Sequence, residues 1–572
     1  MTPPLSPPTA PLAVPPPPPA RPHPDRFIKH ANLMSALTLV SRFGGLVRDK
    51  VCSYYIGVDT SWAAFWMGFQ FPNLFRRVFG EGALTAVFVP VYTEVLEKEG
   101  PEKAGRLANA TLTLLTLVLA AITLLGEALL IPLAMSPAVL PPNRLAAAMI
   151  AIMLPYCMMV CAVAVMGAIA TVHERFTAQS LSPIILNFFM AGAAAGSALI
   201  MVHSTPRDRI FWVAAAVLVA GLFQVALMLP TLWASGLRVS PVFSFASAGL
   251  GAILRPMLPI AIGYCAVQIN TFMDTQIAWW FSPDGHGNLD HFTLFGHLFH
   301  TAMLPGAGAK LSVAQRIYLL PVGIFGVSMA TAIFPLMARA AAREETPELK
   351  RLLVGGLRKT LFLSIPASFG MILIALPLIT LVYLGGKVTP DDVSRAYHAA
   401  IFFCLGIWAF EAQMVITRVY FVLKDTKTPT QVALAMILLN FCLNLLLIWP
   451  LQEAGIALST TIAAIAQSVI LLAILRRRLG PLGLRSLGGN VLRGLAATAI
   501  MVAAGLAITA IPMPWDHPGV NPLTAKWLTS LVKLPLLVAV CGMIYLGLTR
   551  LMQMPEVGDV PFVGRYLRAR KA

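Results

Sequence analysis

Four arginines lie inside stretches of sequence that are otherwise apolar enough to cross a membrane. Arg42 and Arg48 lie in the first such stretch, at about residues 31–57, Arg76 lies in the second, and Arg316 lies in a later one. A charge at the centre of a bilayer costs about 2.5–3.5 kcal/mol on insertion scales, so such side chains usually face a bundle interior or a water-filled cavity. A guanidinium stays protonated and presents a planar set of donors that suits phosphate oxygens. The four arginines therefore predict a cavity that binds an anion.

The residues around these arginines support that prediction. Gly44 and Gly45 lie between the first two and permit a kink or local unwinding of the helix. Asp49 follows Arg48 and can orient it through a charge-assisted hydrogen bond. Prolines flank the other two arginines, and broken helices that carry charge are typical of transporters. A purely structural role for the arginines, paired to carbonyl groups and Asp49, is the alternative.

A second polar set lies in the later apolar stretches. Its members are Gln268, Asn270, Asp274, Asn440, Asn444, Ser459, Thr460 and Thr461. Asn440 and Asn444 are four residues apart and therefore share one helix face. One carboxylate with amide and hydroxyl oxygens suits Na⁺ or a proton relay. Hydrogen bonding between helices, worth roughly 0.6–2 kcal/mol for each bond, explains the same residues equally well.

Composition identifies the protein class. Hydrophobic residues make up 58% of the 572 residues, charged residues 12%, and the mean hydropathy is +0.77. Soluble domains average roughly 45–50% apolar and about 25% charged residues, so the chain is expected to be a polytopic all-α membrane protein. The net charge of +17 is attributed to cytoplasmic loops and not to nucleic-acid binding.

The apolar stretches predict about fourteen transmembrane helices. They lie at about 31–57, 62–92, 107–135, 145–172, 181–203, 210–235, 252–281, 312–338, 357–385, 397–423, 430–451, 454–476, 489–512 and 526–549. Similar segments at 174–187 and 423–440 each place charged residues and a Pro before an apolar helix with Asn, and they occur six helices apart. This repetition favours two lobes of six helices, 29–240 and 241–480, followed by two extra helices in 481–552.

Loop charges predict the orientation. Lys and Arg concentrate on the side that holds both chain ends, which places the N-terminus and the C-terminus in the cytoplasm. Residues 1–28 are Pro-rich and expected to be disordered, and residues 553–572 form a basic tail. The loop 282–310 is rich in Gly and His; metal binding there is conceivable, but a periplasmic loop is the better interpretation. Neither a P-loop nor a hydrolase motif occurs, so no enzyme activity and no cofactor are expected.

The motifs that carry these residues resemble the lipid II flippase family MurJ, also called MviN, of the multidrug/oligosaccharidyl-lipid/polysaccharide exporter superfamily. The similar stretches are SRFGGLVRDK (41–50), FPNLFRRVFGEGALTAVFVPVYTE (71–94), QINTFMD (268–274), RIYLLPVGIFGVSMATAIFP (316–335) and YFVLKDTKTP (420–429). The resemblance implies a fold with a central V-shaped cavity, and a groove for a lipid tail at the last two helices. It also implies a multi-pass protein of the bacterial inner membrane that turns lipid II, an undecaprenyl-diphosphate-linked peptidoglycan precursor, to the periplasmic leaflet by alternating access.

The resemblance also implies roles for residues. The substrate-binding residues would be Arg42, Arg48, Asp49, Arg76 and Arg316. A sodium site found in some members would map onto Asp274, Asn440, Asn444, Thr460 and the carbonyl of Ile456. Asn444 stands where that site has an acid, which is expected to weaken cation affinity. The driving force would be Na⁺ or the membrane potential.

Three alternatives remain open. An exporter of organic cations would require acids in the cavity, whereas acids are few in the apolar stretches: Asp49, Glu81, Asp274 and Glu411. An exporter of another polyprenyl-linked glycan would have the same cations. A non-transporting membrane scaffold is expected to lack them. The expected partners are lipid II, membrane lipids and cell-wall synthesis machinery, and the protein is expected to be a monomer.

Overall fold

The computed structural model describes residues 24–559, apart from 81–82, 202, 245–248, 288, 295–296 and 516–519. The described chain is almost entirely helical and has one two-stranded antiparallel sheet. Eleven of its helical segments are long and apolar enough to cross a membrane. The tail 1–28 is predicted to be disordered, but the first helix begins at Pro24, and residues 1–23 lie outside the described part.

The N-terminal lobe is built from the first seven α-helices. They are α1 (Pro24–Tyr55), α2 (Thr60–Phe75), the π-helix η1 (Arg76–Gly80), α3 (Ala83–Glu99), α4 (Pro101–Met135), α5 (Pro141–Val172), α6 (Thr177–Ile200) and α7 (Pro206–Trp233). The central helix of this lobe is α5, which packs against α2, α4 and α7, while α6 packs against α1 and α7.

The C-terminal lobe follows, and its second helical segment is interrupted as in the N-terminal lobe. Its elements are α8 (Gly251–Trp280), η2 (Pro283–His286), β1 (His291–Leu294), β2 (His297–His300), α9 (Ala307–Pro321), the π-helix η3 (Val322–Gly326), α10 (Val327–Ala342), α11 (Thr346–Tyr383), α12 (Pro390–Leu405), α13 (Ile407–Val422), α14 (Lys427–Leu451) and α15 (Glu453–Leu479). The π-helices η1 and η3 interrupt the second helical segment of each lobe, which agrees with a repeat of six helices. Such π-helical turns frequently occur at functional sites.

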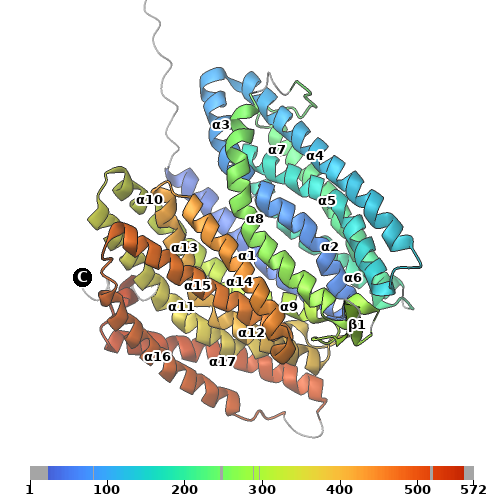
Figure 1. Cartoon of the computed structure of the whole chain (residues 1–572), viewed down its shortest axis with the longest axis vertical. Helices are drawn as coiled ribbons and strands as arrows, with labels where there is room; N and C mark the ends of the chain where they lie inside the picture. The colour runs from blue at the N-terminus through green and yellow to red at the C-terminus, as the bar shows by residue number, and fades with distance from the viewer. Residues whose placement is uncertain are drawn as a thin grey trace, which may run out of the picture.

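Two further helices lie against the C-terminal lobe. α16 (Arg485–Ala510) and α17 (Pro522–Leu551) pack on each other and on α11, and η4 (Pro555–Asp559) ends the described chain. Figure 1 shows both along the outer side of this lobe, away from α4 to α7. Within the described residues, seventeen α-helices are found. When each of the successive pairs α2 and α3, α9 and α10, and α12 and α13 is taken as one segment, they form fourteen segments, in agreement with the prediction.

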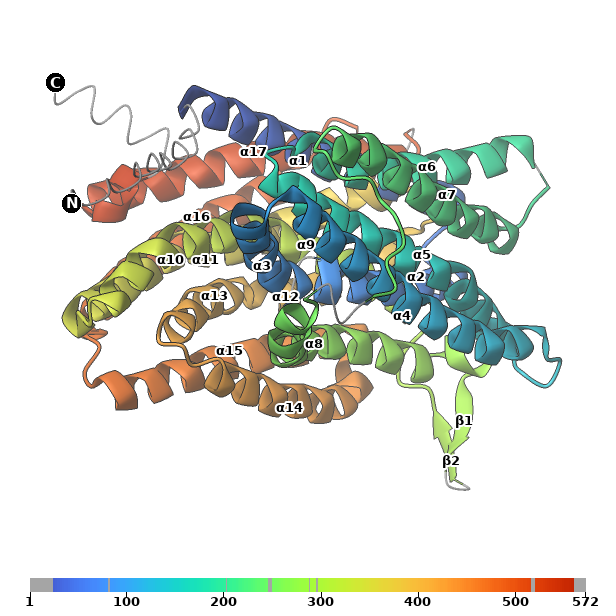
Figure 2. The same cartoon turned by 90° about the horizontal axis from the view of Figure 1, so that it is seen from above.

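The two lobes share a hydrophobic core at one end of the molecule. We call this the hairpin end, because β1 and β2 project from the body there (Figure 2). Buried residues of α2 and α5 form one cluster with those of α9 and α12. At the opposite end, the tail end, where α1 begins and α17 finishes, a separate cluster lies within α10, α11, α13 and α15. Apolar packing therefore joins the lobes chiefly at the hairpin end.

Several helices begin earlier than the apolar stretches predict. α4 begins at Pro101, α11 at Thr346 and α12 at Pro390. Each has a proline in its first turn and charged residues close behind, because helices continue past the apolar stretch into the interface. The predicted loop 282–310 likewise contains β1, β2 and the first turn of α9.

Candidate functional site

Asp49 is the centre of a buried ionic cluster that joins the two lobes. Its side chain is 3% exposed and accepts hydrogen bonds from Arg48 Nε at 3.0 Å and from the Tyr383 hydroxyl at 3.3 Å. Arg316 of α9 forms an ion pair with the second oxygen of the same carboxylate. The structure therefore brings three of the five predicted anion-site residues together, from α1 and α9, and adds Tyr383 of α11.

Arg316 has a second contact in the opposite lobe. Its guanidinium carbon lies 4.9 Å from the centre of the Trp66 ring on α2. A cation over an aromatic face gains about 0.5–2 kcal/mol, depending on how far it is removed from water. Sequence reasoning missed Trp66 and Tyr383, because neither carries a charge and each is far from Arg316 along the chain.

Asn187 of α6 holds Arg48 from the other side. Its Oδ1 accepts a hydrogen bond from Arg48 Nη1 at 2.9 Å, and its Nδ2 donates to the carbonyl of Ser41 at 3.1 Å. A Cβ placed on Gly44 would lie 3.7 Å from Asn187 Nδ2, so α6 approaches α1 closely at the glycine pair. α1 remains helical through Gly44 and Gly45, and the unwinding that the glycines permit does not occur.

The remaining two arginines occupy different places. Arg42 is exposed on α1, and a Cβ placed on Gly323 would lie 3.1 Å from its Nη2, so Arg42 reaches η3 of the opposite lobe. Arg76 lies in η1, where its Nη2 donates to Asn73 Oδ1 at 2.8 Å. Its neighbour Arg77 donates to Gln268 Oε1 on α8 at 3.2 Å.

The predicted cation-site residues all meet at one buried point between α8, α14 and α15. Asp274 accepts hydrogen bonds from Asn444 Nδ2 at 2.7 Å and from Thr460 Oγ1 at 3.2 Å. Thr460 Oγ1 also lies 3.0 Å from the carbonyl of Ile456. The Asn440 amide, in the orientation that satisfies both of its polar atoms, accepts from Thr460 Oγ1 at 3.2 Å and donates to Asp274 Oδ1 at 3.1 Å. The carboxylate, hydroxyl and carbonyl oxygens that a hard cation prefers are present, but the amide nitrogens of Asn440 and Asn444 both donate to Asp274.

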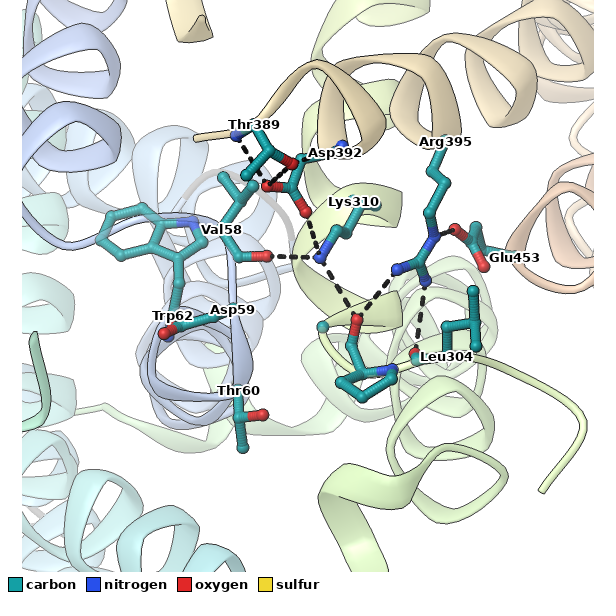
Figure 3. Close-up of polar contacts among 12 residues, drawn as sticks. Val58, Asp59, Thr60, Trp62, Leu304, Lys310, Thr389, Asp392, Arg395 and Glu453 are labelled. Atoms are coloured by element: carbon teal, nitrogen blue, oxygen red, sulfur yellow. Dashed lines mark hydrogen bonds and ion pairs between the residues drawn. The ribbon is translucent and has the colours of Figure 1, made fainter. Parts of the chain in front are cut away.

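At the hairpin end, a buried lysine ties the lobes together (Figure 3). Lys310 is 3% exposed, and its Nζ lies 3.0 Å from the carbonyl of Val58, in the N-terminal lobe, and 2.8 Å from Asp392 Oδ1 on α12. Beside it, Arg395 pairs with Glu453 at 2.7 Å and donates to the carbonyl of Pro305 at 3.1 Å. The sequence analysis placed Lys310 in a loop, whereas the structure places it in α9, because that helix begins before its apolar stretch.

A cavity of about 710 Å³ opens at the tail end between α10, α11 and the segment 481–483. Its lining combines apolar and basic side chains, among them Met329, Ile333, Leu336, Lys350, Arg351 and Lys359. An amphiphile with a negatively charged head matches both parts of this lining. The histidines of the hairpin belong to no cluster of three or more metal-ligating His, Cys, Asp or Glu residues within the described residues.

A family model described as lipid II flippase MurJ matches residues 52–524 of the chain. The chain belongs to this MurJ family. The matched segment contains Arg76, Arg316 and the Asp274 cluster, while Arg42, Arg48 and Asp49 precede it. The family model describes a lipid transporter and not a catalytic enzyme.

Relatives extend the match to nearly the whole chain. A probable lipid II flippase MurJ of Vibrio cholerae is 28% identical over 458 residues, 78% of this chain and 82% of that protein. A probable lipid II flippase MurJ of Rhizobium tropici is 27% identical over 544 residues, 93% and 96% of the two chains. Each alignment covers most of this chain and most of the relative.

Solved structures show the same fold. A lipid II flippase MurJ in an inward closed conformation superposes with a TM-score of 0.66, at 22% identity over 89% of this chain and 98% of that chain. An inward-facing multidrug transporter of the MATE family, from the MOP superfamily, gives 0.59 at 13% identity over 79% and 99%. The chain therefore shares the overall fold of both structures.

Proposed function

We propose that this protein is a flippase that turns lipid II, a polyprenyl-diphosphate-linked peptidoglycan precursor, from the cytoplasmic to the periplasmic leaflet. The observation that supports this most directly is the contact of Arg48 and Arg316, from different lobes, with one buried carboxylate. Two permanent cations in this place form a site for a diphosphate. Organic cations would instead require a site of carboxylates, so a drug exporter is disfavoured.

The physical task is to carry a diphosphate head group through hydrocarbon. A charged group left unpaired in an apolar medium costs many kcal/mol. Arginines that face a hydrated path lower this cost, and the polyprenyl tail stays in lipid. The V-shaped cavity between the lobes is part of this proposal, with Arg42, Arg76 and the Asp49 cluster along it.

Asp49 acts in this scheme as a resident anion. It pairs with both Arg48 and Arg316 while no substrate is bound and offsets one of their two positive charges, and a diphosphate competes with it for the same donors. Replacing one carboxylate by two phosphate groups changes which contacts hold α1 and α9 together. The lobes can then exchange one arrangement for another, as alternating access requires.

The hairpin end would face the periplasm and the tail end the cytoplasm, with both termini cytoplasmic. In this orientation the Lys310 contacts and the shared apolar core close the periplasmic side, so lipid II enters from the cytoplasmic leaflet. The basic and apolar lining of the tail-end cavity suits a lipid phosphate and its chain. The groove at α16 and α17 would carry the tail.

We propose a sodium ion as the ligand of the Asp274 cluster. The carboxylate of Asp274, Thr460 Oγ1 and the Ile456 carbonyl supply hard oxygens, and Asn444 Oδ1 is buried without a hydrogen-bond partner among the described residues. Rotation of the Asn444 amide would present that oxygen. Bound Na⁺ would neutralise Asp274 and crosslink α8, α14 and α15. Because Asn444 is uncharged, we expect weak affinity, with the membrane potential as the main driving force.

The proposed activity has a direct test. In cells that depend on this protein, lipid II exposure on the periplasmic leaflet is measured with an impermeant reagent after Arg316→Ala and Arg316→Lys substitution. We expect Arg316→Ala to abolish exposure at normal protein levels in the membrane, and Arg316→Lys to retain part of it. Wild-type exposure in Arg316→Ala would refute the assigned role. We also propose that the protein is a monomer and that it contacts cell-wall enzymes. The flipping mechanism requires neither property.

A further inference from the structure

Glu411 is a buried acid that the proposed anion path does not use. It lies on α13, its exposure is 0%, and neither carboxyl oxygen has a hydrogen-bond partner among the described residues. A carboxylate without a partner in an apolar environment is very costly, whereas the neutral acid is tolerated at far lower cost. Ionisable residues inside membrane segments usually serve function.

The acid packs directly against the π-helical break of the C-terminal lobe. A Cβ placed on Gly326, the last residue of η3, would lie 2.9 Å from Glu411 Cγ and 3.2 Å from Met414 Sδ. Glycine at this position therefore allows the acid to touch the backbone of η3. η3 joins α9, which carries Arg316, to α10 at the tail end of the lobe. A movement of Glu411 against Gly326 would therefore affect the angle between these two helices.

Other polar groups nearby also lack partners. On α11, the hydroxyls of Ser364 and Thr360 are buried without hydrogen-bond partners among the described residues. One turn from Ser364, the hydroxyl of Ser368 accepts a hydrogen bond from the backbone of Trp408 at 3.2 Å, so this face of α11 meets the start of α13. The hydroxyls of Ser364 and Thr360 can therefore form new hydrogen bonds without breaking existing ones.

Few charges oppose or assist ionisation of Glu411. Arg42 reaches Gly323 on the same π-helix, and Tyr318 of α9 stacks on Phe410 at 5.2 Å. Other titratable groups on α13 and on the helices around it include Cys404 on α12, Arg339 on α10, Arg358 and Lys359 on α11, Arg418 on α13, Cys442 on α14 and Arg476 on α15.

We propose that Glu411 binds one proton and that its neutral form stabilises the arrangement seen here, in which the lobes are joined at the hairpin end. Ionisation would draw the carboxylate toward water and away from Gly326. Protonation from the periplasm would then favour return of the empty protein to this arrangement. This inference rests on the proposed flippase cycle for its purpose, but the proton site itself does not require lipid II.

The test measures the conformation without transport. Spin labels on Ala138→Cys and Leu289→Cys, exposed positions in loops of the two lobes at the hairpin end, report the distance between them in lipid nanodiscs over a pH series. We expect the wild-type protein to shift toward longer distances as pH rises. Glu411→Gln, which mimics the neutral acid, should keep the short distance at every pH, and Glu411→Asp should restore a response. Glu127→Gln, an acid on α4 of the other lobe, is the matched control.

Two outcomes would overturn the proton site. One is a wild-type distance that does not change with pH, and the other is a Glu411→Gln protein that responds as the wild type does. Thermal unfolding of each variant shows whether it is folded. If the pH response depends on Glu411 but lipid II exposure is absent in cells, the proton site stands and the flippase assignment fails.

Discussion

Asp49 and Arg316 form an ion pair that joins α1 of the N-terminal lobe to α9 of the C-terminal lobe. The carboxylate is 3% exposed and the arginine side chain 20%, so water reaches the pair only from the arginine side. A buried pair of this kind contributes little net stability, but breaking it by removing one partner costs about 3–5 kcal/mol. Its interpretation as an anion site occupied by a residue of the protein leads to the first prediction.

Asp49→Asn should increase affinity for a soluble diphosphate and slow lipid transport. The amide keeps the size of the carboxylate but carries no charge to offset those of Arg48 and Arg316, so an added anion meets less competition. Pyrophosphate binding to the purified protein, measured by calorimetry, should tighten several-fold. Asp208→Asn, on the exposed first turn of α7, is the control. Weaker binding after Asp49→Asn would contradict the idea of competition.

Asn187→Ala should reduce transport by removing the second support of Arg48. A hydrogen bond to a charged group contributes about 1.5–3 kcal/mol, which corresponds to a loss of roughly tenfold or more in diphosphate affinity. Asn187→Gln keeps an uncharged amide oxygen that can accept from Arg48 and should retain more activity. Ser180→Ala, on the tail-end part of α6, serves as a control. Equal activity of Asn187→Ala and wild type would show that Asp49 alone positions Arg48.

Lys310→Met should destabilise the protein and open the hairpin end. It leaves Asp392 without its buried cation and removes the hydrogen bond to the Val58 carbonyl. We expect a lower midpoint of thermal unfolding, and greater labelling by an impermeant thiol reagent of a cysteine placed at Ala307, which is fully buried at the start of α9. The double variant Lys310→Met/Asp392→Asn should lose less stability than the sum of the single variants, because the two side chains interact directly. If the stability losses of the two single variants add up to that of the double variant, Lys310 and Asp392 do not interact, which would contradict the ion pair.

Asn444→Asp should create a stronger cation site. A second carboxylate beside Asp274 raises the electrostatic attraction for Na⁺ and replaces the amide that now donates to Asp274. Binding to the folded protein stabilises it by about 2.7 kcal/mol when the ligand is at a hundred times its Kd. Added NaCl should therefore raise the midpoint temperature of thermal unfolding more for Asn444→Asp than for the wild type. Choline chloride is the control for ionic strength. An equal rise in both proteins would mean that residue 444 does not limit cation binding.

Helix number and the lobe pattern were predictable from the chain because they depend on local composition. Apolar stretches of bilayer length and the similar segments at 174–187 and 423–440 gave the fourteen segments and the repeat of six. Helix starts were less predictable. α12, for example, begins at Pro390 with Thr389 as its N-cap, ahead of its apolar stretch. Polar and proline residues of this kind start a helix but do not contribute to a hydropathy signal.

The sequence by itself determined that cations lie within the membrane segments, since a charged residue in an apolar stretch is visible without a fold. Only the tertiary structure decided their partners. Asn187 meets Arg48, Tyr383 meets Asp49, and Lys310 meets Val58, from residues that lie 139, 334 and 252 positions apart. Such pairs form because helices distant in sequence pack side by side, and hydrophobic periodicity does not specify which helices become neighbours.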